Sequence, residues 1–440
     1  MSANQSTLAV QAGTTAVTVA EAKLGPWLVI AACTFNAVLC YINTRGWLYI
    51  GNTQITICEL VILASGLFSI RSHIGARAYQ ISALIFLYSM FARLINPDLY
   101  LETLHDVAIM YIFYKLGTLT SIETGNRTLW IAMVIAIAFG VLEWKMLPTF
   151  ENLFNIWNYY VNKGLIDPDQ ANLSGTVLYP SGFRGTAAVR MMFAGEFGSH
   201  RISSIFLEPT GLGYFAEVAF AWCVSTACGP WWSRLALLFM SVVCFVLPDS
   251  RLGSTTCLLM LILSFVPFLR SNLAVFLMPL LAVIALTIYG AFHEIPGVQP
   301  SLITDDFPGR LLFSGRLLGY WDLIHWMGFA LSPVYTTDTG FAYQINNLGL
   351  PSTFLLLVVF ARNTPRTLAA ARMRAMIAIY YTTSLSIGNA VFSIKTAALL
   401  WFLYGTTNAI SRAKSRLVPA APPESSNRAI IPYAGEGSSA

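Results

Sequence analysis

The feature that most constrains this chain is a series of apolar stretches, most of them long enough to cross a lipid bilayer. A helix needs roughly 20 apolar residues to span the hydrocarbon core. Lipid offers the backbone no hydrogen-bond partners, so helices must dominate such a fold. The sequence predicts twelve spans, near residues 25–43, 53–70, 78–95, 105–120, 128–147, 210–228, 234–247, 252–269, 273–291, 346–361, 374–388 and 394–410. The seventh and the last two of these spans are short.

Composition agrees with this interpretation. Of the 440 residues, 56% are hydrophobic and only 11% are charged, whereas soluble domains carry roughly 25% charged residues. All seven cysteines fall within or at the ends of apolar runs, so no disulfide framework is expected. No basic and aromatic patch typical of nucleic-acid binding is present. We therefore expect an all-α, polytopic integral membrane protein and no nucleic-acid partner.

Basic residues predict the orientation, because cytoplasmic loops carry an excess of Lys and Arg. With the N-terminus inside, the short outside loops hold only Arg45, Arg93 and Arg251. The inside loops and the C-terminal tail hold the other loop cations: Arg71, Arg77, Arg127, Arg234, Arg270, Arg362, Arg366, Arg372, Arg374, Arg412, Lys414 and Arg416. Both termini are therefore predicted to face the cytoplasm.

Three parts are expected along the chain. Residues 1–24 lack the features of a cleavable signal peptide and form a predicted cytoplasmic tail. Residues 25–410 form the transmembrane domain. Residues 411–440, rich in Pro, Ser, Gly and Ala, form a second cytoplasmic tail that we expect to be disordered.

Two long segments, 148–209 and 292–345, fall outside under this topology. They contain amphipathic stretches such as Phe150–Val161, which suit helices lying on the membrane surface. Their aromatic residues are candidates for stacking on sugar rings: Trp157, Tyr159, Tyr179, Tyr320 and Trp321.

Three arginines on the predicted outside face stand where short loops usually avoid cations. Arg201 precedes an apolar run, Arg251 lies in a four-residue polar break between two runs, and Arg316 follows Ser314 and Gly315. A guanidinium offers a planar fork of donors that matches phosphate oxygens and stays charged. Several together could hold a lipid diphosphate and stabilise it as a leaving group. The alternative is interfacial snorkelling or pairing with a nearby carboxylate.

The motifs around these arginines resemble those of the O-antigen polymerase and ligase superfamily (Wzy and WaaL types), over about residues 200 to 350. The first motif is the segment 201–213, RISSIFLEPTGLG, and the second is 249–253, DSRLG. The third begins at Ser314-Gly315-Arg316 and continues with Trp321, Pro333, Gly340 and Asn346-Asn347-Leu348-Gly349. Within that superfamily the chain is most similar to the exopolysaccharide polymerases of xanthan-type gum clusters.

The resemblance implies a GT-C-like glycosyltransferase in the bacterial inner membrane, with its active site facing the periplasm. Such an enzyme moves a growing glycan from undecaprenyl diphosphate onto the next lipid-linked repeat unit, inverting the anomeric carbon without a metal or cofactor. Arg201, Arg251 and Arg316 are then the diphosphate ligands. Further substrate contacts are expected from Ser250, Ser314, Trp321 and Asn346. Implied partners are the lipid-linked units, the bilayer, a chain-length regulator and export proteins.

One departure from the superfamily concerns the base. Ligase-type members carry a histidine before the Asn-like position, where this chain reads Tyr343-Gln344-Ile345-Asn346-Asn347. A base for the acceptor hydroxyl must therefore come from elsewhere. The candidates are Glu208, Asp249 and His325, and His200 and Asp322 also lie outside or at the interface. Glu208 is favoured as a partner that orients an arginine, and packing at the interface is the default interpretation of His325.

Other charged residues in or near the spans are either functional groups or interhelical pairs: Glu59, Lys115, Glu143, Lys145, Glu217 and Lys395. Asp167-Pro168-Asp169 resembles a metal–nucleotide element, but a plain turn is favoured. The rival function is a flippase or transporter of the lipid-linked oligosaccharide, which should place its cations midway across the bilayer and show related halves. A ligase-type transferase also stays open.

Overall fold

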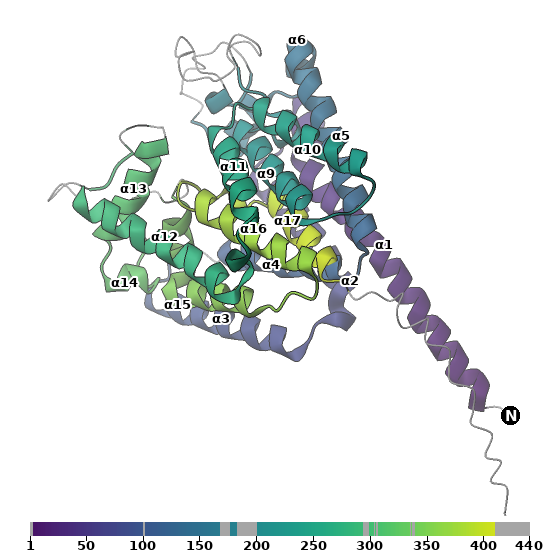
Figure 1. Ribbon diagram of the computed structural model, residues 1–440. Helices are drawn as coiled ribbons and strands as arrows, with labels where there is room; N and C mark the ends of the chain where they lie inside the picture. Colours follow the sequence, from purple (N-terminus) through teal and green to yellow (C-terminus); the bar gives the residue numbers. More distant parts are fainter. Residues whose placement is uncertain are drawn as a thin grey trace, which may run out of the picture. The chain divides into compact units, whose positions relative to one another are not determined.

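The computed structural model describes residues 3–99, 102–167, 177–182, 200–293, 299–302, 304, 307–334, 336 and 339–409. Within these residues the protein is all-α, as predicted (Figure 1). The α-helices are α1 (Ala3–Thr44), α2 (Asn52–Ile70), α3 (Ala76–Ile95), α4 (Glu102–Thr118), α5 (Ile122–Lys145), α6 (Leu147–Leu153), α7 (Ile156–Asn162), α9 (Pro209–Ser225), α10 (Trp231–Val246), α11 (Arg251–Ser264), α12 (Asn272–Phe292), α13 (Phe307–Tyr320), α14 (Leu323–Trp326), α15 (Gly340–Arg362), α16 (Leu368–Ser384) and α17 (Ile394–Thr407). Short 3-10 helices are η1 (Arg71–His73), η2 (Pro180–Gly182), η4 (Ser204–Phe206), η5 (Pro267–Arg270) and η6 (Ala390–Phe392).

Each predicted span overlaps an α-helix, although several bounds differ by four residues or more. In the described part of the chain, six helical segments are long and apolar enough to cross a membrane: Leu24–Thr44, Asn52–His73, Ala76–Ile95, Ile122–Lys145, Asn272–Phe292 and Gly340–Arg362. A multi-span membrane protein is therefore supported. The count of twelve and the orientation stay predictions, because α4, α9, α10, α11, α16 and α17 are only 14 to 17 residues long.

Helix α17 is enclosed by its neighbours. Every residue from Ile394 to Thr407 is buried, and the helix packs against α1, α4, α5 and α9. It approaches α4 closely because glycines meet, since a Cβ added at Gly117 or Gly405 would collide with the facing backbone. Small residues at such crossings are typical of helix packing in membranes. A helix covered in this way need not match the bilayer in length by itself.

A second pair of closely packed helices, α12 and α13, includes part of the predicted outside segment 292–345. Helix α13 packs against α12, where a Cβ added at Gly290 or Gly315 would collide with the other helix's backbone. This contact fixes the position of Arg316, the residue that follows Gly315. The segment also ends earlier than predicted, because α15 already begins at Gly340.

Helix α15 is broken within the predicted motif. Gly349 has φ 71° and ψ 156°, and Pro351 follows it. A Cβ at Gly349 would collide with the Met327 carbonyl, so the loop after α14 sits directly against the break. Hydropathy places a span near 346–361, and misses the buried helical turns before the break.

Two expectations for the outer parts of the chain change. Most of the predicted tail 1–24 belongs to α1, which begins at Ala3, whereas 411–440 lies outside the described residues. The stretch Phe150–Val161 forms parts of α6 and α7, but its apolar residues Phe150 and Tyr159 are fully buried in the protein. It therefore packs inward rather than on a membrane surface.

Candidate functional site

The first two motifs meet in the folded chain. The Nε atom of Arg201 donates a hydrogen bond to the Pro248 carbonyl at 2.6 Å, and the Ile202 amide donates to the Leu247 carbonyl at 3.3 Å. Arg201 is 7% exposed. The loop before α9 and the loop before α11 thus form one unit, which we call the paired loops (residues 201–208 and 248–251).

The paired loops hold strained backbone. Among the described residues, every non-glycine with a positive φ lies here: Ser204 at 54°, Leu207 at 63° and Asp249 at 50°. Such conformations cost about 1–3 kcal/mol each and persist only where the surroundings impose them, which happens most often at functional sites.

Glu143 of α5 imposes part of this shape. Its side chain has no exposed surface and accepts hydrogen bonds from the Ser203 amide at 2.9 Å, the Ser204 amide at 2.6 Å and the Ser203 hydroxyl at 3.2 Å. The Ser204 hydroxyl in turn donates to the Ala136 carbonyl of the same helix. Glu143 therefore anchors the loop and is not placed to act on a substrate.

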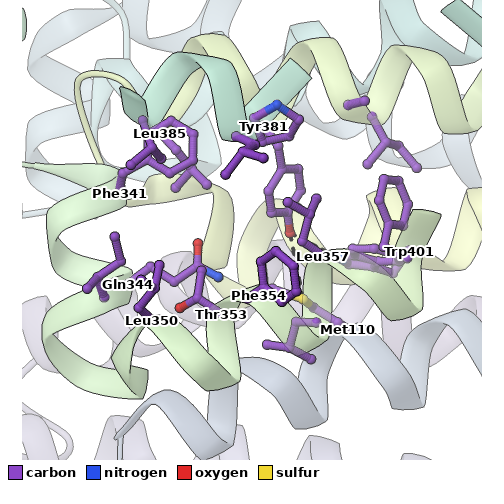
Figure 2. A pocket seen from close by; sticks show the side chains of 18 residues that line it. Met110, Phe341, Gln344, Leu350, Thr353, Phe354, Leu357, Tyr381, Leu385 and Trp401 are labelled. Atoms are coloured by element: carbon purple, nitrogen blue, oxygen red, sulfur yellow. Dashed lines mark hydrogen bonds between the residues drawn. The ribbon is translucent and has the colours of Figure 1, made fainter. Parts of the chain in front are cut away.

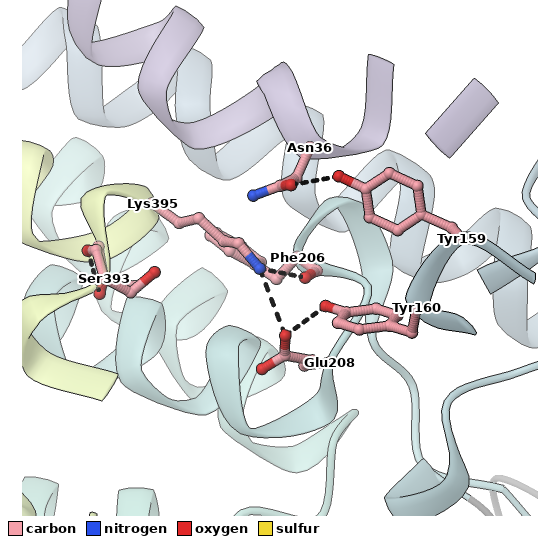
Figure 3. A network of polar contacts seen from close by, with 8 residues as sticks. Asn36, Tyr159, Tyr160, Phe206, Glu208, Ser393 and Lys395 are labelled. Atoms are coloured by element: carbon pink, nitrogen blue, oxygen red, sulfur yellow. Dashed lines mark hydrogen bonds and ion pairs between the residues drawn. The ribbon is translucent and has the colours of Figure 1, made fainter. Parts of the chain in front are cut away.

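Glu208 pairs with a lysine rather than with an arginine, which corrects the expected partner (Figure 3). Its Oε1 atom lies 3.5 Å from Lys395 Nζ and accepts a hydrogen bond from the Tyr160 hydroxyl, while Lys395 also donates to the Phe206 carbonyl at 3.2 Å. Burial raises the pKa of Glu208, but Lys395 and Tyr160 outweigh it and leave this pKa below its ordinary value. A carboxylate held ionised in this way is a weak base.

The second of the paired loops opens α11. Ser250 caps the helix, its hydroxyl oxygen accepting from the Gly253 amide at 3.1 Å. Gly213 of α9 lies so close that a Cβ there would strike the Ser250 hydroxyl. Arg251, the first residue of α11, is exposed, and Asp249 beside it is half-buried. Arg201 and Arg251 therefore lie in the same paired loops, and of the two only Arg251 is exposed.

Arg316 lies on a different pair of helices, because α13 packs mainly against α12 and α15. It is 3% exposed, and its Nε and Nη2 atoms lack a hydrogen-bond partner within the described part of the chain. The Ser314 hydroxyl and the Trp321 indole N–H are also buried without a partner there. A guanidinium stays charged, so its burial with no counter-ion among the described residues is costly and favours an anion as its missing partner.

His325 is oriented by a residue three positions earlier. Its Nδ1 lies 2.7 Å from Asp322 Oδ1, which also accepts the His325 amide hydrogen bond at 3.0 Å. These two hydrogen bonds from His325 lower the pKa of Asp322. The ring lies parallel to Trp321, at 12° and 6.3 Å between centroids. Asp322 thus sets the imidazole in place and leaves its other nitrogen for a proton.

Two side chains that were expected to contact the substrate, those of Asn346 and Tyr159, are buried and hydrogen-bonded within the protein. The Asn346 side chain is 6% exposed, and its carbonyl oxygen accepts from the Ser332 amide at 2.7 Å. Tyr159 is fully buried and its hydroxyl donates to Asn36 at 2.6 Å, so it is not available to stack on a sugar. Both side chains instead hold a loop or helix in position.

An apolar cavity of about 110 Å³ lies beside the break in α15, between α4, α12, α15, α16 and α17 (Figure 2). Its walls include Phe354, Tyr381 and Trp401, with Gln344 and Thr353 as polar positions. Among the residues that the structure describes, the buried Thr353 hydroxyl has no hydrogen-bond partner.

Two titratable residues near the start of α4, His105 and Asp106, were not predicted from the sequence as site residues. His105 Nε2 lies 3.5 Å from Glu59 Oε2, and His105 Nδ1 lies 3.5 Å from Asp106 Oδ1. In the sequence, the adjacent His105 and Asp106 at the start of an apolar run could have indicated this cluster.

Within the described ranges, no three His, Cys, Asp or Glu side chains are grouped to hold a metal ion, and Asp169 lies outside those ranges.

The chain matches no family model, no curated protein and no solved structure.

Proposed function

We propose that this protein is a membrane glycosyltransferase of the polysaccharide polymerase type. It transfers a growing glycan from undecaprenyl diphosphate onto the next lipid-linked repeat unit, at the periplasmic face of a bacterial inner membrane, in the synthesis of a xanthan-type exopolysaccharide. The observation that carries the proposal is the buried guanidinium of Arg316, whose Nε and Nη2 atoms have no protein partner in the described chain. A diphosphate supplies the missing charge and acceptors.

The reaction needs positive charge where the leaving group departs. An acceptor hydroxyl attacks the anomeric carbon, the bond from that carbon to the diphosphate oxygen breaks, and the diphosphate leaves with the electron pair. Arg316 stabilises this developing charge in a site screened from water. Arg251, exposed at the start of α11, contacts the diphosphate of the acceptor unit. Arg201 positions that loop through the Pro248 carbonyl.

The proton of the acceptor hydroxyl goes to His325. Of the three proposed bases, Glu208 forms an ion pair with Lys395 and has a lowered pKa. Asp249 lies in a turn where its φ is positive and strained. His325 has its Nδ1 oriented by Asp322, as the base beside a nucleophile is often oriented by a third group. The apolar cavity beside α15 offers a place for part of the isoprenoid chain.

The test supplies purified protein with lipid-linked repeat units and follows longer glycans and released lipid diphosphate. Wild type should elongate. Arg316→Gln should lose about 100-fold or more of the rate, the usual effect of removing one donor to a developing oxyanion. Arg316→Lys should also be slow, because it keeps the charge but not the fork.

Arg93→Gln, an exposed cation at the end of α3, is the matched control and should stay active. No elongation by folded wild-type protein overturns the proposal. Movement of intact lipid-linked units across a vesicle membrane without elongation would instead support the rival flippase.

A further inference from the structure

A groove with one cation lies at the far end of α9, α10 and α11 from the paired loops. Helix α9 starts at Pro209 beside those loops and ends at Ser225 near the groove, α10 starts at the groove, and α11 ends there. The groove has a volume of about 340 Å³. Its lining consists of Phe220, Cys223 and Val224 from α9, Trp231, Arg234, Leu235 and Leu238 from α10, and Leu261 from α11.

The groove opens on a surface suited to lipid. Around it, large apolar side chains are exposed on α10 and α11, among them Leu235 at 57%, Phe239 at 66% and Ile262 at 55%. Trp231, 74% exposed, stands at the first turn of α10. An aromatic residue at the end of an apolar helix is typical of the boundary between hydrocarbon and head groups. The groove thus runs from that boundary along the apolar face.

Arg234 is the one charged side chain in this lining. It is exposed and has no ion pair or hydrogen bond from its side chain to any residue that the structure describes. On the predicted topology α10 and α11 cross the membrane, so this apolar surface faces the bilayer and the anion that suits Arg234 comes from a lipid head group. A guanidinium binds phosphate oxygens in pairs, and basic pockets between membrane helices are suited to anionic head groups.

We propose that this groove binds an anionic phospholipid, with Arg234 on the phosphate and one acyl chain along Val224, Leu238 and Leu261. A polar or soluble anion would leave the apolar walls unused, and a lipid without net negative charge would leave Arg234 without a counter-charge. The site is separate from the paired loops and is independent of the proposed transferase activity. It places a specific lipid at the end of the bundle opposite to Arg201 and Arg251.

Native mass spectrometry of the detergent-purified protein tests this, with phosphatidylglycerol and phosphatidylcholine of identical chains as probes. Wild type should retain phosphatidylglycerol preferentially. Arg234→Gln should lower that retention about fivefold, the effect of one basic residue at an anionic surface. Arg234→Lys should fall between the two, and Leu238→Trp, which fills the groove, should weaken both lipids.

Arg127→Gln is the matched control, because Arg127 is an exposed cation on α5 outside the groove lining. The proposal is wrong if Arg234→Gln retains phosphatidylglycerol as wild type does, or if Arg127→Gln loses as much. It is also wrong if glycerol phosphate without acyl chains displaces the lipid, because a bare anion site would then account for the binding.

Discussion

At the scale of single residues, Glu143 shows how a carboxylate buried in a helix can shape a loop far along the chain. Both of its oxygens accept hydrogen bonds from the backbone of Ser203 or Ser204. Glu143→Gln replaces one acceptor with a donor that faces these amides, leaving buried groups unsatisfied. We expect a loss of about 1–3 kcal/mol of stability, measured as a lower unfolding temperature in detergent.

Glu123→Gln is the control for Glu143→Gln, because Glu123 is exposed on the same helix. It should unfold at the wild-type temperature. Equal stability of Glu143→Gln and wild type would show that the loop holds its shape without this anchor.

The pair of Lys395 and Glu208 makes a prediction about pH. Lys395 contributes to holding the pKa of Glu208 below its ordinary value. The ion pair of Lys395 and Glu208 therefore stabilises the folded protein fully above the unfolded-state pKa of about 4.3. It is lost as pH falls through the lower folded-state pKa. Lys395→Met should therefore unfold at a lower temperature than wild type at pH 7, and this difference should shrink as pH falls below about 4.

Thermal unfolding in detergent at pH 7 and at acid pH measures this difference. Lys145→Met, which removes an exposed lysine stacked on Trp144, serves as the control and should show no such pH dependence. A wild-type advantage over Lys395→Met that stays constant with pH would contradict the pairing of Lys395 with Glu208.

At the scale of elements, the break in α15 depends on Gly349. Its φ of 71° with ψ of 156° belongs to a region that is essentially restricted to glycine, and a Cβ would also strike the Met327 carbonyl. Gly349→Ala should therefore destabilise the protein by more than the roughly 1–2 kcal/mol of left-handed strain alone. Unfolding temperature measures the loss.

Gly164→Ala is the comparison, because Gly164 also has a positive φ, 75°, but no described atom lies within 4 Å of an added Cβ. It should show strain without collision and hence the smaller loss. Equal losses for Gly164→Ala and Gly349→Ala would mean that the approach of the Met327 loop adds nothing.

Sequence patterning located the helices better than their partners. Apolar length predicts where each helix lies, because the bilayer imposes that length. It carries no information on which helix covers which, so the enclosure of α17 and the cation facing Glu208 were both missed. The meeting of Arg201 with Pro248 agrees with the predicted shared outside face, whereas the helix pair that buries Arg316 depends on glycine contacts between α12 and α13.

At the scale of the whole molecule, the number of spans decides which side each loop occupies. If only the six long segments cross, α3 ends outside, α4 does not cross, and α5 returns the chain to the inside. If α4 also crosses, α5 ends outside together with α6 and α7. Helix α4 has 17 residues and packs closely on the buried α17, so its length need not match the bilayer, and we expect it to cross.

Leu165 reports on this difference, because it is 55% exposed in the turn after α7. Leu165→Cys should react with a membrane-impermeant maleimide in intact spheroplasts if twelve helices cross, and only after permeabilisation if six do. Arg45→Cys should be labelled from outside under both topologies, and Thr364→Cys from inside under both, so they calibrate the assay. Labelling of Leu165→Cys only after permeabilisation would put α6 and α7 in the cytoplasm, away from the face where the proposed transfer takes place.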